Sequence, residues 1–457
     1  MNKELNISKY NNIYFIGIGG IGMSALAKYF VANGKNVAGY DKTASEITNS
    51  LEKNNVAIHF TDAIENIPLE FKDKNTTLVI YTPAIPKEHK ELNYFLSTNF
   101  IVLKRAEILG LITKDTFCFA VAGTHGKTTT SSILGHILKQ SNVNATAFLG
   151  GIASNYNSNL ILGSDKISVV EADEYDRSFL KLSPNIACIT ATDADHLDIY
   201  GKKDALLKSF KDFANLVNNQ LFVTYGIPIN GITYGFEAAA DYQASNVQIK
   251  NGITYFDVKT PKETIQNIAL QLPGNHNILN TLAALAMANS YGVSLEKIKN
   301  AIASFEGIKR RFNIKINTKD FALIDDYAHH PTEINAVFQT VSALYPNKSK
   351  TVIFQPHLFS RTRDFIEEFT TSLAQFDKIL LLDIYPAREL PIQGVTSNWL
   401  AEKILKTNKN VLVVKGISQI IENITTENNV VSMLGAGDIG VMVDTIIHKL
   451  NTKILIQ

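Results

Sequence analysis

Several features of secreted, membrane-bound and nucleic-acid-binding proteins are missing from this sequence. It has two cysteines, Cys118 and Cys188, and each lies in an apolar run typical of a strand, which favours buried free thiols over a disulfide or a metal site. The polar start, residues 1–12, lacks the apolar core of a signal peptide, and no later stretch has about 18 uninterrupted apolar residues. We therefore predict a cytoplasmic protein with no membrane insertion.

A large net charge of either sign is also missing. Lysine and arginine total 44 while aspartate and glutamate total 43, so the formal charge of +1 gives no overall field that would attract a polyanion. No nucleic-acid partner is predicted, and any phosphate group has to be bound by a local site. Low-complexity segments and short repeats are lacking as well.

What the sequence does contain is enough apolar material to bury several cores. Apolar residues make up 45% and charged residues 19%, which is the balance of a globular protein. Short β-branched and aromatic runs alternate with segments of helical periodicity, the pattern of parallel α/β sheets with flanking helices. The length suggests roughly two to four domains, and we predict three, at residues 1–113, 114–311 and 312–457.

Most of the predicted strands are followed by a loop and then a helix. They comprise residues 13–16, 36–40, 77–81, 117–122, 167–170, 185–190, 321–324, 351–354, 379–382, 411–414 and 430–433. Residues 109–115 are predicted to be a connector. Residues 221–268, which contain the turn dipeptide Asn251-Gly252, are predicted to be an antiparallel excursion.

The strongest chemical signal is a glycine-containing loop, AGTHGKTTT, at residues 122–130. It follows an apolar strand and opens a helix, so backbone N–H groups and the helix N-terminus can wrap a triphosphate. In such a loop Lys127 would reach the β and γ oxygens and Thr128 would hold Mg²⁺. Val121 stands where the common phosphate loop has its first glycine. A chance glycine turn before a helix is the alternative interpretation.

Two predicted strands end in acidic clusters close to this loop. Glu171 opens the run EADEYD, and the run DADHLD at residues 193–198 contains His196. The carboxyl ends of parallel strands meet at one edge of a sheet, and hard oxygen ligands suit Mg²⁺. We select Glu171 and His196 as metal ligands. Any single acidic residue here could instead belong to a solvated loop.

A second glycine loop, GIGGIG at residues 17–22, fits the dinucleotide pattern, with Asp41 at the end of the next strand. Taken alone it would indicate a nicotinamide dehydrogenase. Residues 435–440 match the same pattern, however, and two dinucleotides in one chain are not expected; for this second match we prefer a tight strand-to-helix turn. The first loop indicates a backbone shaped for a pyrophosphate, which a UDP-sugar also has.

Two runs in the last predicted domain gather histidines and arginines at strand ends, DDYAHHP at residues 325–331 and QPHLFSRTR at residues 355–363. Paired guanidinium groups fit recognition of a carboxylate or a phosphate. A lone histidine is more often structural than catalytic, so His330 and His357 carry less weight.

Together these motifs resemble the Mur ligases of peptidoglycan precursor synthesis, in order, from about residue 13 to residue 440. The stretches that carry the resemblance are GIGGIGMSALA, GTHGKTTT, EADEYDRSFL, DADHLDIYG, LPGNHNILNTLAALA, KRRF, DDYAHHPTE and QPHLFSRTRDF. The resemblance implies three α/β domains: an N-terminal Rossmann-like domain for a UDP-sugar, a central ATPase domain, and a C-terminal Rossmann-like domain that closes over the nucleotide.

The resemblance also implies the residues that bind ATP and Mg²⁺. The ATP-binding set is Gly123, Thr124, His125, Gly126, Lys127, Thr128, Thr129, Asn277, Asn280 and Asp326. The metal ligands are Thr128, Thr129, Glu171 and His196. Lys127, His196 and Arg311 are the catalytic candidates.

The implied substrates are small molecules, UDP-N-acetylmuramate and L-alanine. The substrate-binding set is Gly19, Gly20, Gly22, Asp41, Arg105, His330 and Arg361. The γ-phosphate of ATP would activate the carboxylate as an acyl phosphate, which the amine then attacks, while domain closure excludes water.

Two features depart from the family pattern. Leu358 stands where many members have arginine, and neither Lys208 nor Lys211 has the spacing of the carbamoylated lysine of some members. Three alternatives stay open: a ligase that attaches a whole tripeptide to UDP-N-acetylmuramate, an NAD-dependent oxidoreductase, and a nucleotide-binding regulator.

Overall fold

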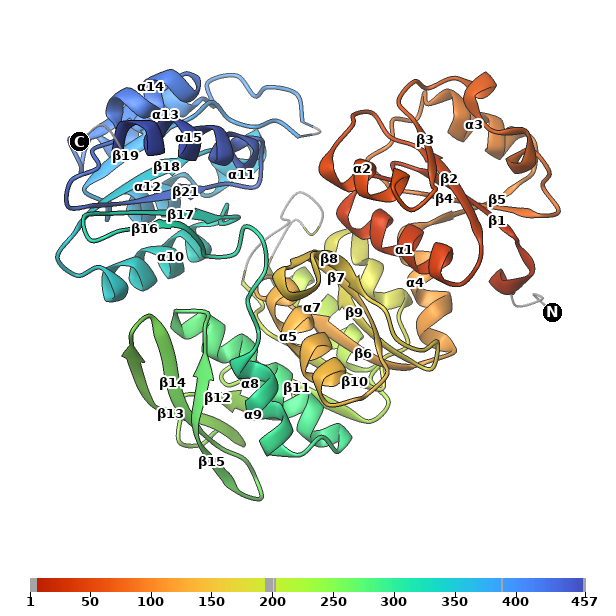
Figure 1. The fold of residues 1–457 in the computed structure, drawn as a ribbon, viewed down its shortest axis with the longest axis horizontal. Helices are drawn as coiled ribbons and strands as arrows, with labels where there is room; N and C mark the ends of the chain where they lie inside the picture. The colour runs from red at the N-terminus through yellow and green to blue at the C-terminus, as the bar shows by residue number, and fades with distance from the viewer. Residues whose placement is uncertain (1–5, 194–199, 201–202, 388, 455–457) are drawn as a thin grey trace. The chain divides into compact units, whose positions relative to one another are not determined.

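The computed structural model describes residues 6–193, 200, 203–387 and 389–454. Two compact units can be distinguished, and each is described by itself. The first holds residues 1–247, 256–269 and 279–306, and the second holds 248–255, 270–278 and 307–457. The described residues form three separate β-sheets (Figure 1).

The N-terminal sheet has five parallel strands in the order β3-β2-β1-β4-β5. The strands are β1 (Asn12–Ile16), β2 (Asn36–Tyr40), β3 (Ala57–His59), β4 (Thr77–Tyr81) and β5 (Ile101–Lys104). The helices are α1 (Ile21–Ala32), α2 (Glu46–Glu52), α3 (Lys90–Ser97) and α4 (Arg105–Lys114). Successive side chains of β1 belong to different apolar clusters: Ile13 and Phe15 lie in one, and Tyr14 and Ile16 lie in the other. This alternation is expected for a sheet that is covered on both faces.

The central sheet has ten strands in the order β15-β14-β13-β12-β11-β10-β6-β9-β7-β8. The strands are β6 (Phe117–Ala122), β7 (Thr146–Ala153), β8 (Ser158–Ile161), β9 (Ile167–Ala172), β10 (Ile186–Ile189), β11 (Gln220–Thr224), β12 (Ile232–Gly235), β13 (Tyr242–Lys250), β14 (Ile253–Lys259) and β15 (Thr264–Leu270). The helices are α5 (Lys127–Gln140), α7 (Lys203–Ala214), α8 (Asn275–Tyr291) and α9 (Leu295–Ala303). β6 lies between β10 and β9, so the loop after β6 is flanked by the ends of two parallel strands.

The C-terminal sheet has six strands in the order β16-β17-β21-β18-β19-β20, parallel except for β16. The strands are β16 (Asn313–Asn317), β17 (Phe321–Asp326), β18 (Ser349–Phe354), β19 (Lys378–Leu381), β20 (Val411–Val413) and β21 (Asn429–Leu434). The helices are α10 (Pro331–Leu344), α11 (Phe359–Asp364), α12 (Ile366–Leu373), α13 (Ser397–Ile404), α14 (Gly416–Asn423) and α15 (Ile439–Ile454). Short 3-10 helices cover Ile7–Lys9, Ile64–Asn66, Leu69–Phe71, Ser154–Tyr156 and Tyr175–Lys181.

The fold class predicted from the sequence is confirmed: three domains, each with a largely parallel sheet and flanking helices. The prediction of a connector at residues 109–115 is wrong, because most of this segment belongs to helix α4, which begins at Arg105. Its start is capped by the Glu107 carboxylate, which accepts the Lys104 N–H at 2.8 Å. Ile108 and Ile112 of α4 are buried in the same apolar cluster as β1, which holds the helix in place.

The prediction of an antiparallel segment at residues 221–268 is partly wrong. β11 pairs with β12 in parallel, and β12 pairs with β13 in parallel. The turn at Asn251-Gly252 is as predicted, with φ values of +53° and +78° that suit a two-residue hairpin turn between β13 and β14. Cys118 and Cys188 are buried free thiols, as predicted.

Candidate functional site

The phosphate loop joins β6 to α5, and close neighbours of its two glycines leave no room for a side chain. Gly123 and Gly126 have φ values of +131° and +82°. A Cβ atom at Gly123 would lie 2.1 Å from the Thr190 hydroxyl, and one at Gly126 would lie 2.3 Å from Oδ1 of Asn280. Both positions therefore need glycine on grounds of conformation and of space.

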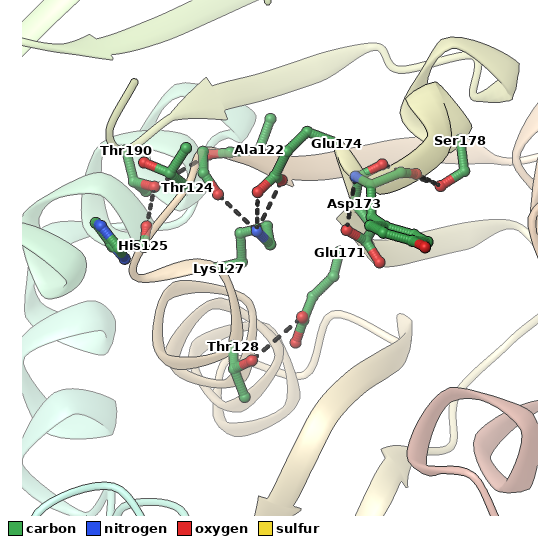
Figure 2. Close-up of polar contacts among 12 residues, drawn as sticks. Ala122, Thr124, His125, Lys127, Thr128, Glu171, Asp173, Glu174, Ser178 and Thr190 are labelled. Carbon is green, nitrogen blue, oxygen red and sulfur yellow. Dashed lines mark hydrogen bonds and ion pairs between the residues drawn. The ribbon is translucent and has the colours of Figure 1, made fainter. Parts of the chain in front are cut away.

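Thr190, at the end of β10, ties the loop to the neighbouring strand. Its hydroxyl contacts the carbonyl oxygen of Ala122 at 3.1 Å and makes a short hydrogen bond to that of His125 (Figure 2). The Thr124 hydroxyl accepts the N–H of Asp193 at 3.1 Å. Thr190 is not among the residues predicted from the sequence; its position at the end of the strand beside β6 is the signal that could have indicated it.

Lys127 begins α5, and its ammonium group makes three hydrogen bonds. It donates to the Gly123 carbonyl at 2.7 Å and to the two carboxylate oxygens of Glu174 at 2.9 and 2.7 Å (Figure 2). Glu174 is fully buried. Burial by itself would lower the pKa of Lys127, but the carboxylates of Glu174 and Asp173 outweigh it and raise that pKa. Glu174 is not among the residues predicted from the sequence.

Glu171, at the end of β9, faces the first turn of α5. Its carboxylate accepts hydrogen bonds from the hydroxyls of Thr128 and Ser131, both at 3.2 Å, and from the Gly150 N–H at 2.5 Å. Thr129 is buried in the same turn. The carboxylate and hydroxyl oxygens of Glu171 and Thr128 are the donor type that Mg²⁺ prefers, so this pair fits the predicted cation.

His196, the other predicted metal ligand, lies outside the described residues. Within the part of the chain that the structure describes, no group of three or more His, Cys, Asp or Glu side chains is arranged to hold a metal ion. The fit to Mg²⁺ therefore depends on Glu171, Thr128 and the phosphate oxygens that the loop would bind.

The predicted nucleotide ligands Asn277 and Asn280 lie on α8. Asn280 accepts a hydrogen bond from the Thr130 hydroxyl at 3.3 Å and lies against Gly126, so it borders the phosphate loop. Asn277 donates to the Pro273 carbonyl at 2.7 Å and is buried.

The other predicted nucleotide ligands, Arg311 and Asp326, belong to the second compact unit. The Asp326 carboxylate accepts the N–H groups of Phe312 and Ala328 at 2.6 and 2.7 Å. Burial raises its pKa to about 6, against the lowering effect of Arg311 and these two hydrogen bonds. The Arg311 guanidinium lies 5.1 Å from the centre of the Tyr327 ring.

The N-terminal glycine loop is held by Asp41, whose carboxylate accepts the N–H of Gly19 at 2.7 Å. Asp41 therefore supports the loop in addition to any role in binding a ribose. Arg105 packs beside Gly22, where a Cβ atom would lie 2.8 Å from its Nη1. Its guanidinium also lies 3.6 Å from the Asp173 carboxylate. The structure thus brings the predicted residues Gly19, Gly22, Asp41 and Arg105 together in the first unit.

The C-terminal sheet gathers aromatic and basic groups after β17, β18 and β19. The His357 ring lies 5.8 Å from the His329 ring and is stacked on Tyr385 at 5.7 Å. Arg361 is buried, with Nη1 3.4 Å from Nδ1 of His357. His330 forms the N-cap of α10, where its Nδ1 accepts the Thr332 N–H at 3.4 Å. His330 thus caps the helix, and its ring also packs against the Phe365 ring at 4.9 Å.

Side chains of the protein itself occupy the space beside residues 435–440, the loop that gives the second match to the glycine pattern. Oε1 of Gln355 accepts the Ile439 N–H at 3.0 Å, and Arg310 donates to the Gly435 carbonyl at 2.6 Å. A Cβ atom at Gly440 would lie 2.3 Å from the Arg310 guanidinium. These contacts favour the interpretation as a tight strand-to-helix turn.

Comparison with protein families gives three consecutive matches. Residues 12–116 match the model described as Mur ligase family, catalytic domain, and residues 121–288 match the Mur ligase middle domain. Residues 310–437 match the model described as Mur ligase, glutamate ligase domain. The three matches together span most of the chain.

Full-length relatives and a solved structure agree with these matches. The chain is 56% identical to a UDP-N-acetylmuramate--L-alanine ligase of Flavobacterium psychrophilum, over 98% of this chain and 100% of the relative. It is 55% identical to a protein of the same name from Christiangramia forsetii, over 97% and 98%. The structure of UDP-N-acetylmuramate-alanine ligase MurC from Thermotoga maritima aligns with a TM-score of 0.83 at 28% identity, covering 97% of this chain and 99% of that one.

Proposed function

Because this chain belongs to the Mur ligase family, we infer that it joins L-alanine to UDP-N-acetylmuramate with ATP. The carboxylate attacks the γ-phosphorus of ATP, ADP leaves, and an acyl phosphate forms. The amine of L-alanine then attacks the carbonyl carbon, the amide C–N bond forms, and phosphate leaves with loss of a proton from the nitrogen. The observation that carries this function is full-length similarity to L-alanine ligases together with an intact phosphate loop.

The central domain supplies the groups for phosphoryl transfer in this proposal. ATP and the muramate carboxylate are both anions and repel each other, so a cation between them lowers the barrier. Lys127, raised in pKa and held at the start of α5, is the proposed cation. The N–H groups of residues 123–129 and the N-terminus of α5 are proposed to bind the phosphates.

Mg²⁺ is proposed to be held by Glu171 and Thr128, with Thr129 and His196 as further candidates. When bound, it would neutralise charge on the phosphate oxygens. Glu171 already orients the Thr128 hydroxyl through their 3.2 Å hydrogen bond, so this chain presets the two oxygen donors.

The substrates are proposed to bind at the other two sheets. The glycine loop at residues 17–22 and Arg105 would bind the pyrophosphate of the UDP-sugar, since both offer donors to an anion. Arg361 would bind the carboxylate of L-alanine, and His330 would act by shaping the loop before α10. Asn277, Asn280 and Asp326 are the proposed contacts of the adenosine, and Arg311 that of the γ-phosphate.

Domain limits at residues 113/114 and 311/312 and a cytoplasmic location remain parts of this proposal. The two buried free thiols fit a reducing compartment. No helix among the described residues is long and apolar enough to cross a membrane.

A substrate-dependence assay tests the function. Phosphate release should require ATP, UDP-N-acetylmuramate and L-alanine together, and omission of any one should abolish it. A change in nicotinamide absorbance without phosphate release would instead support a dehydrogenase. Nucleotide binding with no turnover under any combination would support a regulator.

A further inference from the structure

Asn159, on β8 of the central sheet, is fully buried and contacts helix α1 of the N-terminal sheet. Its amide nitrogen donates to the Ile21 carbonyl at 2.6 Å and to the Ser24 hydroxyl at 2.8 Å. Its amide oxygen accepts a hydrogen bond from the Lys28 ammonium at 2.8 Å. A single side chain therefore holds three positions spaced along α1, the helix that begins in the N-terminal glycine loop.

The chemistry of these partners determines which way the Asn159 amide points and where α1 lies. An ammonium group can only donate and a carbonyl oxygen can only accept, so Lys28 and Ile21 require the two ends of an amide. The neighbouring contact between the rings of Tyr29 and Phe148, whose centres are 5.2 Å apart, is apolar and therefore non-directional. If α1 moved along β8, the buried amide would lose partners, which is costly, whereas the apolar contact could adjust. Asn159 therefore sets the position of α1.

The hairpin formed by β7 and β8 also contacts the proposed cation site. The two strands pair antiparallel, and the N–H of Gly150 on β7 donates to the Glu171 carboxylate at 2.5 Å. The turn between the strands is held by Asn155, which donates to the Ser304 carbonyl at 2.8 Å and accepts the Glu306 N–H at 2.9 Å. One anchored hairpin therefore connects the helix of the glycine loop with the carboxylate beside the phosphate loop.

We propose that Asn159 is a positioning residue for the ligase: it fixes α1, and with it the glycine loop, against the hairpin that contacts Glu171. The proposal rests on the proposed function, in which the glycine loop binds the UDP-sugar and Glu171 holds the cation. Phosphoryl transfer needs the muramate carboxylate in line with the γ-phosphate, and a misplacement of about 1 Å can cost about 10²-fold in rate. The proposed contacts of each substrate with its own loop do not involve Asn159, so this side chain acts on the alignment of the substrates and not on their affinity.

The test is turnover by Asn159→Asp, which keeps the size of the side chain and its contact with Lys28, but whose carboxylate cannot donate to the Ile21 carbonyl. Calorimetric titrations with UDP-N-acetylmuramate and with adenylyl imidodiphosphate give the dissociation constants and the number of competent sites. We expect kcat per competent site to fall about 10 to 100-fold, while both dissociation constants and both KM values stay within about twofold of the wild type. A residue needed only for folding would instead lower the number of sites and leave kcat per site unchanged.

Asn429→Asp is the matched control, because it makes the same change in a buried amide of the C-terminal sheet. The Asn429 amide nitrogen donates to the Thr425 carbonyl at 2.8 Å, and its oxygen accepts the Thr351 hydroxyl at 3.2 Å. Since these contacts align neither substrate, kcat per competent site should stay within about twofold of the wild type.

Lys28 provides a second pair of variants. Lys28→Met removes one of the contacts of Asn159 and should lower kcat per site by roughly three- to tenfold, because a charge-assisted hydrogen bond no longer orients the amide. Lys28→Arg keeps a cationic donor and should retain most of the wild-type rate.

A further readout needs no turnover. Hydrogen exchange of the α1 amides should be roughly tenfold or more faster in Asn159→Asp than in the wild type, because the helix loses buried contacts and opens locally more often. The amides of β1 serve as the internal control and should exchange as in the wild type.

Folded Asn159→Asp with unchanged kcat per site, or with weaker UDP-N-acetylmuramate binding while kcat per site is kept, would overturn the proposal. If this variant does not fold, Lys28→Met decides: unchanged kcat per site and unchanged α1 exchange would also overturn it. Absence of L-alanine-dependent turnover in the wild type would refute the proposed function, and the ligase role of Asn159 with it. Hydrogen exchange would still show whether Asn159 holds α1 in that case.

Discussion

Lys127 shows how a structural contact changes what a single substitution is expected to do. From the sequence alone, Lys127→Ala is predicted to abolish turnover without affecting the fold, because the residue lies in a loop motif. In the structure the substitution would leave Glu174 as a buried carboxylate with its ammonium partner removed. Breaking a buried ion pair from one side lowers the free energy of unfolding by about 3 to 5 kcal/mol.

We therefore expect Lys127→Ala to lose activity and stability together. Turnover should fall by about 10² to 10³-fold or more, measured as phosphate release. Urea unfolding should show the loss of stability, and adding Glu174→Ala should restore part of the stability but none of the turnover. Near-normal activity in folded Lys127→Ala would contradict the assignment of the loop.

Glu171→Ala tests the proposed cation site. Removing the carboxylate that contacts Thr128 and Ser131 should raise the Mg²⁺ concentration for half-maximal rate by roughly 10 to 100-fold. A higher Mg²⁺ concentration should recover part of the rate, because the phosphate oxygens still bind the ion. A Mg²⁺ titration of phosphate release measures this; an unchanged midpoint would make Glu171 a structural residue that orders α5.

The sequence predicts the residues of the phosphate loop because glycine, lysine and threonine at these spacings have few other uses after a strand. It does not predict Thr190 or Glu174. Both act through contacts between residues far apart in the chain: Thr190 and Glu174 reach the loop from the ends of β10 and β9, the two strands that flank β6. The acidic run EADEYD contains Glu174, but the run alone does not show which of its carboxylates contacts Lys127. Their identity becomes visible only when the order of strands in the sheet is known.

At the scale of elements, the predicted strands that form long apolar runs are confirmed in all three sheets. The missed strands include β3, with three residues, and β7, which contains Gly150 and Gly151. Strand patterns of that length or with paired glycines resemble loops. Helix α4 is missed because its amphipathic pattern is short. The side chains that it buries are determined by packing, which the sequence does not show.

An element-scale feature with a testable consequence joins β1, β3 and α3. Glu91, fully buried at the start of α3, accepts the Tyr14 hydroxyl at 2.8 Å, and that hydroxyl lies 2.8 Å from Nε2 of His59. Burial raises the pKa of Glu91 to about 7, although the hydrogen bonds from Tyr14 and the Ala63 N–H oppose it. The cluster ties the middle of β1 to the end of β3 and to the start of α3.

The raised pKa of Glu91 predicts that the N-terminal sheet loses stability as the pH rises. The folded chain keeps this proton until about pH 7, whereas the unfolded chain loses it near 4.5, so the stabilisation is complete below 4.5 and fades up to 7. The change is on the order of 3 kcal/mol. Hydrogen-exchange protection factors of the β1 amides at pH 5 and pH 7.5 measure it.

Glu91→Gln should remove this loss, because a glutamine can still hydrogen-bond to Tyr14 but does not titrate. Protection should then be higher at pH 7.5 than at pH 5, since burial lowers the pKa of His59 and His89 and the folded chain gains stability where they become neutral. A fall of the same size in Glu91→Gln would show that another group causes the pH dependence.

At the scale of the whole molecule, three modules along the sequence predict three sheets because each begins with a strand, a glycine-rich or acidic turn and a helix. The sequence also predicts which ends of the strands carry the candidate site residues. The phosphate loop, the first glycine loop and Arg361 all follow the carboxyl ends of predicted strands. It does not predict that α8 carries Asn280 against Gly126, which depends on packing of a helix that starts about 150 residues later in the chain. A division of labour between the modules, with one substrate bound by each, is part of the proposed function.

The last prediction concerns the amino-acid substrate, which distinguishes free L-alanine from a preformed tripeptide. Arg361 is buried and contacts His357, so this contact can orient its guanidinium to bind a carboxylate through two parallel hydrogen bonds. Arg361→Lys loses that fork while keeping the charge. It should raise the KM for L-alanine far more than the KM for ATP, roughly tenfold or more, as one good charge-assisted contact is worth about 1.5 to 3 kcal/mol.

Substrate competition completes this test. The wild type should prefer L-alanine to L-alanyl-γ-D-glutamyl-diaminopimelate, and it should accept glycine or L-serine slowly, because one methylene is worth only about 1 to 3 kcal/mol of discrimination. Initial rates of phosphate release with each amine, at fixed ATP and UDP-N-acetylmuramate, give the order. A better rate with the tripeptide would replace the L-alanine assignment, and an equal rise in both KM values in Arg361→Lys would remove Arg361 from the amino-acid site while leaving the ligase function in place.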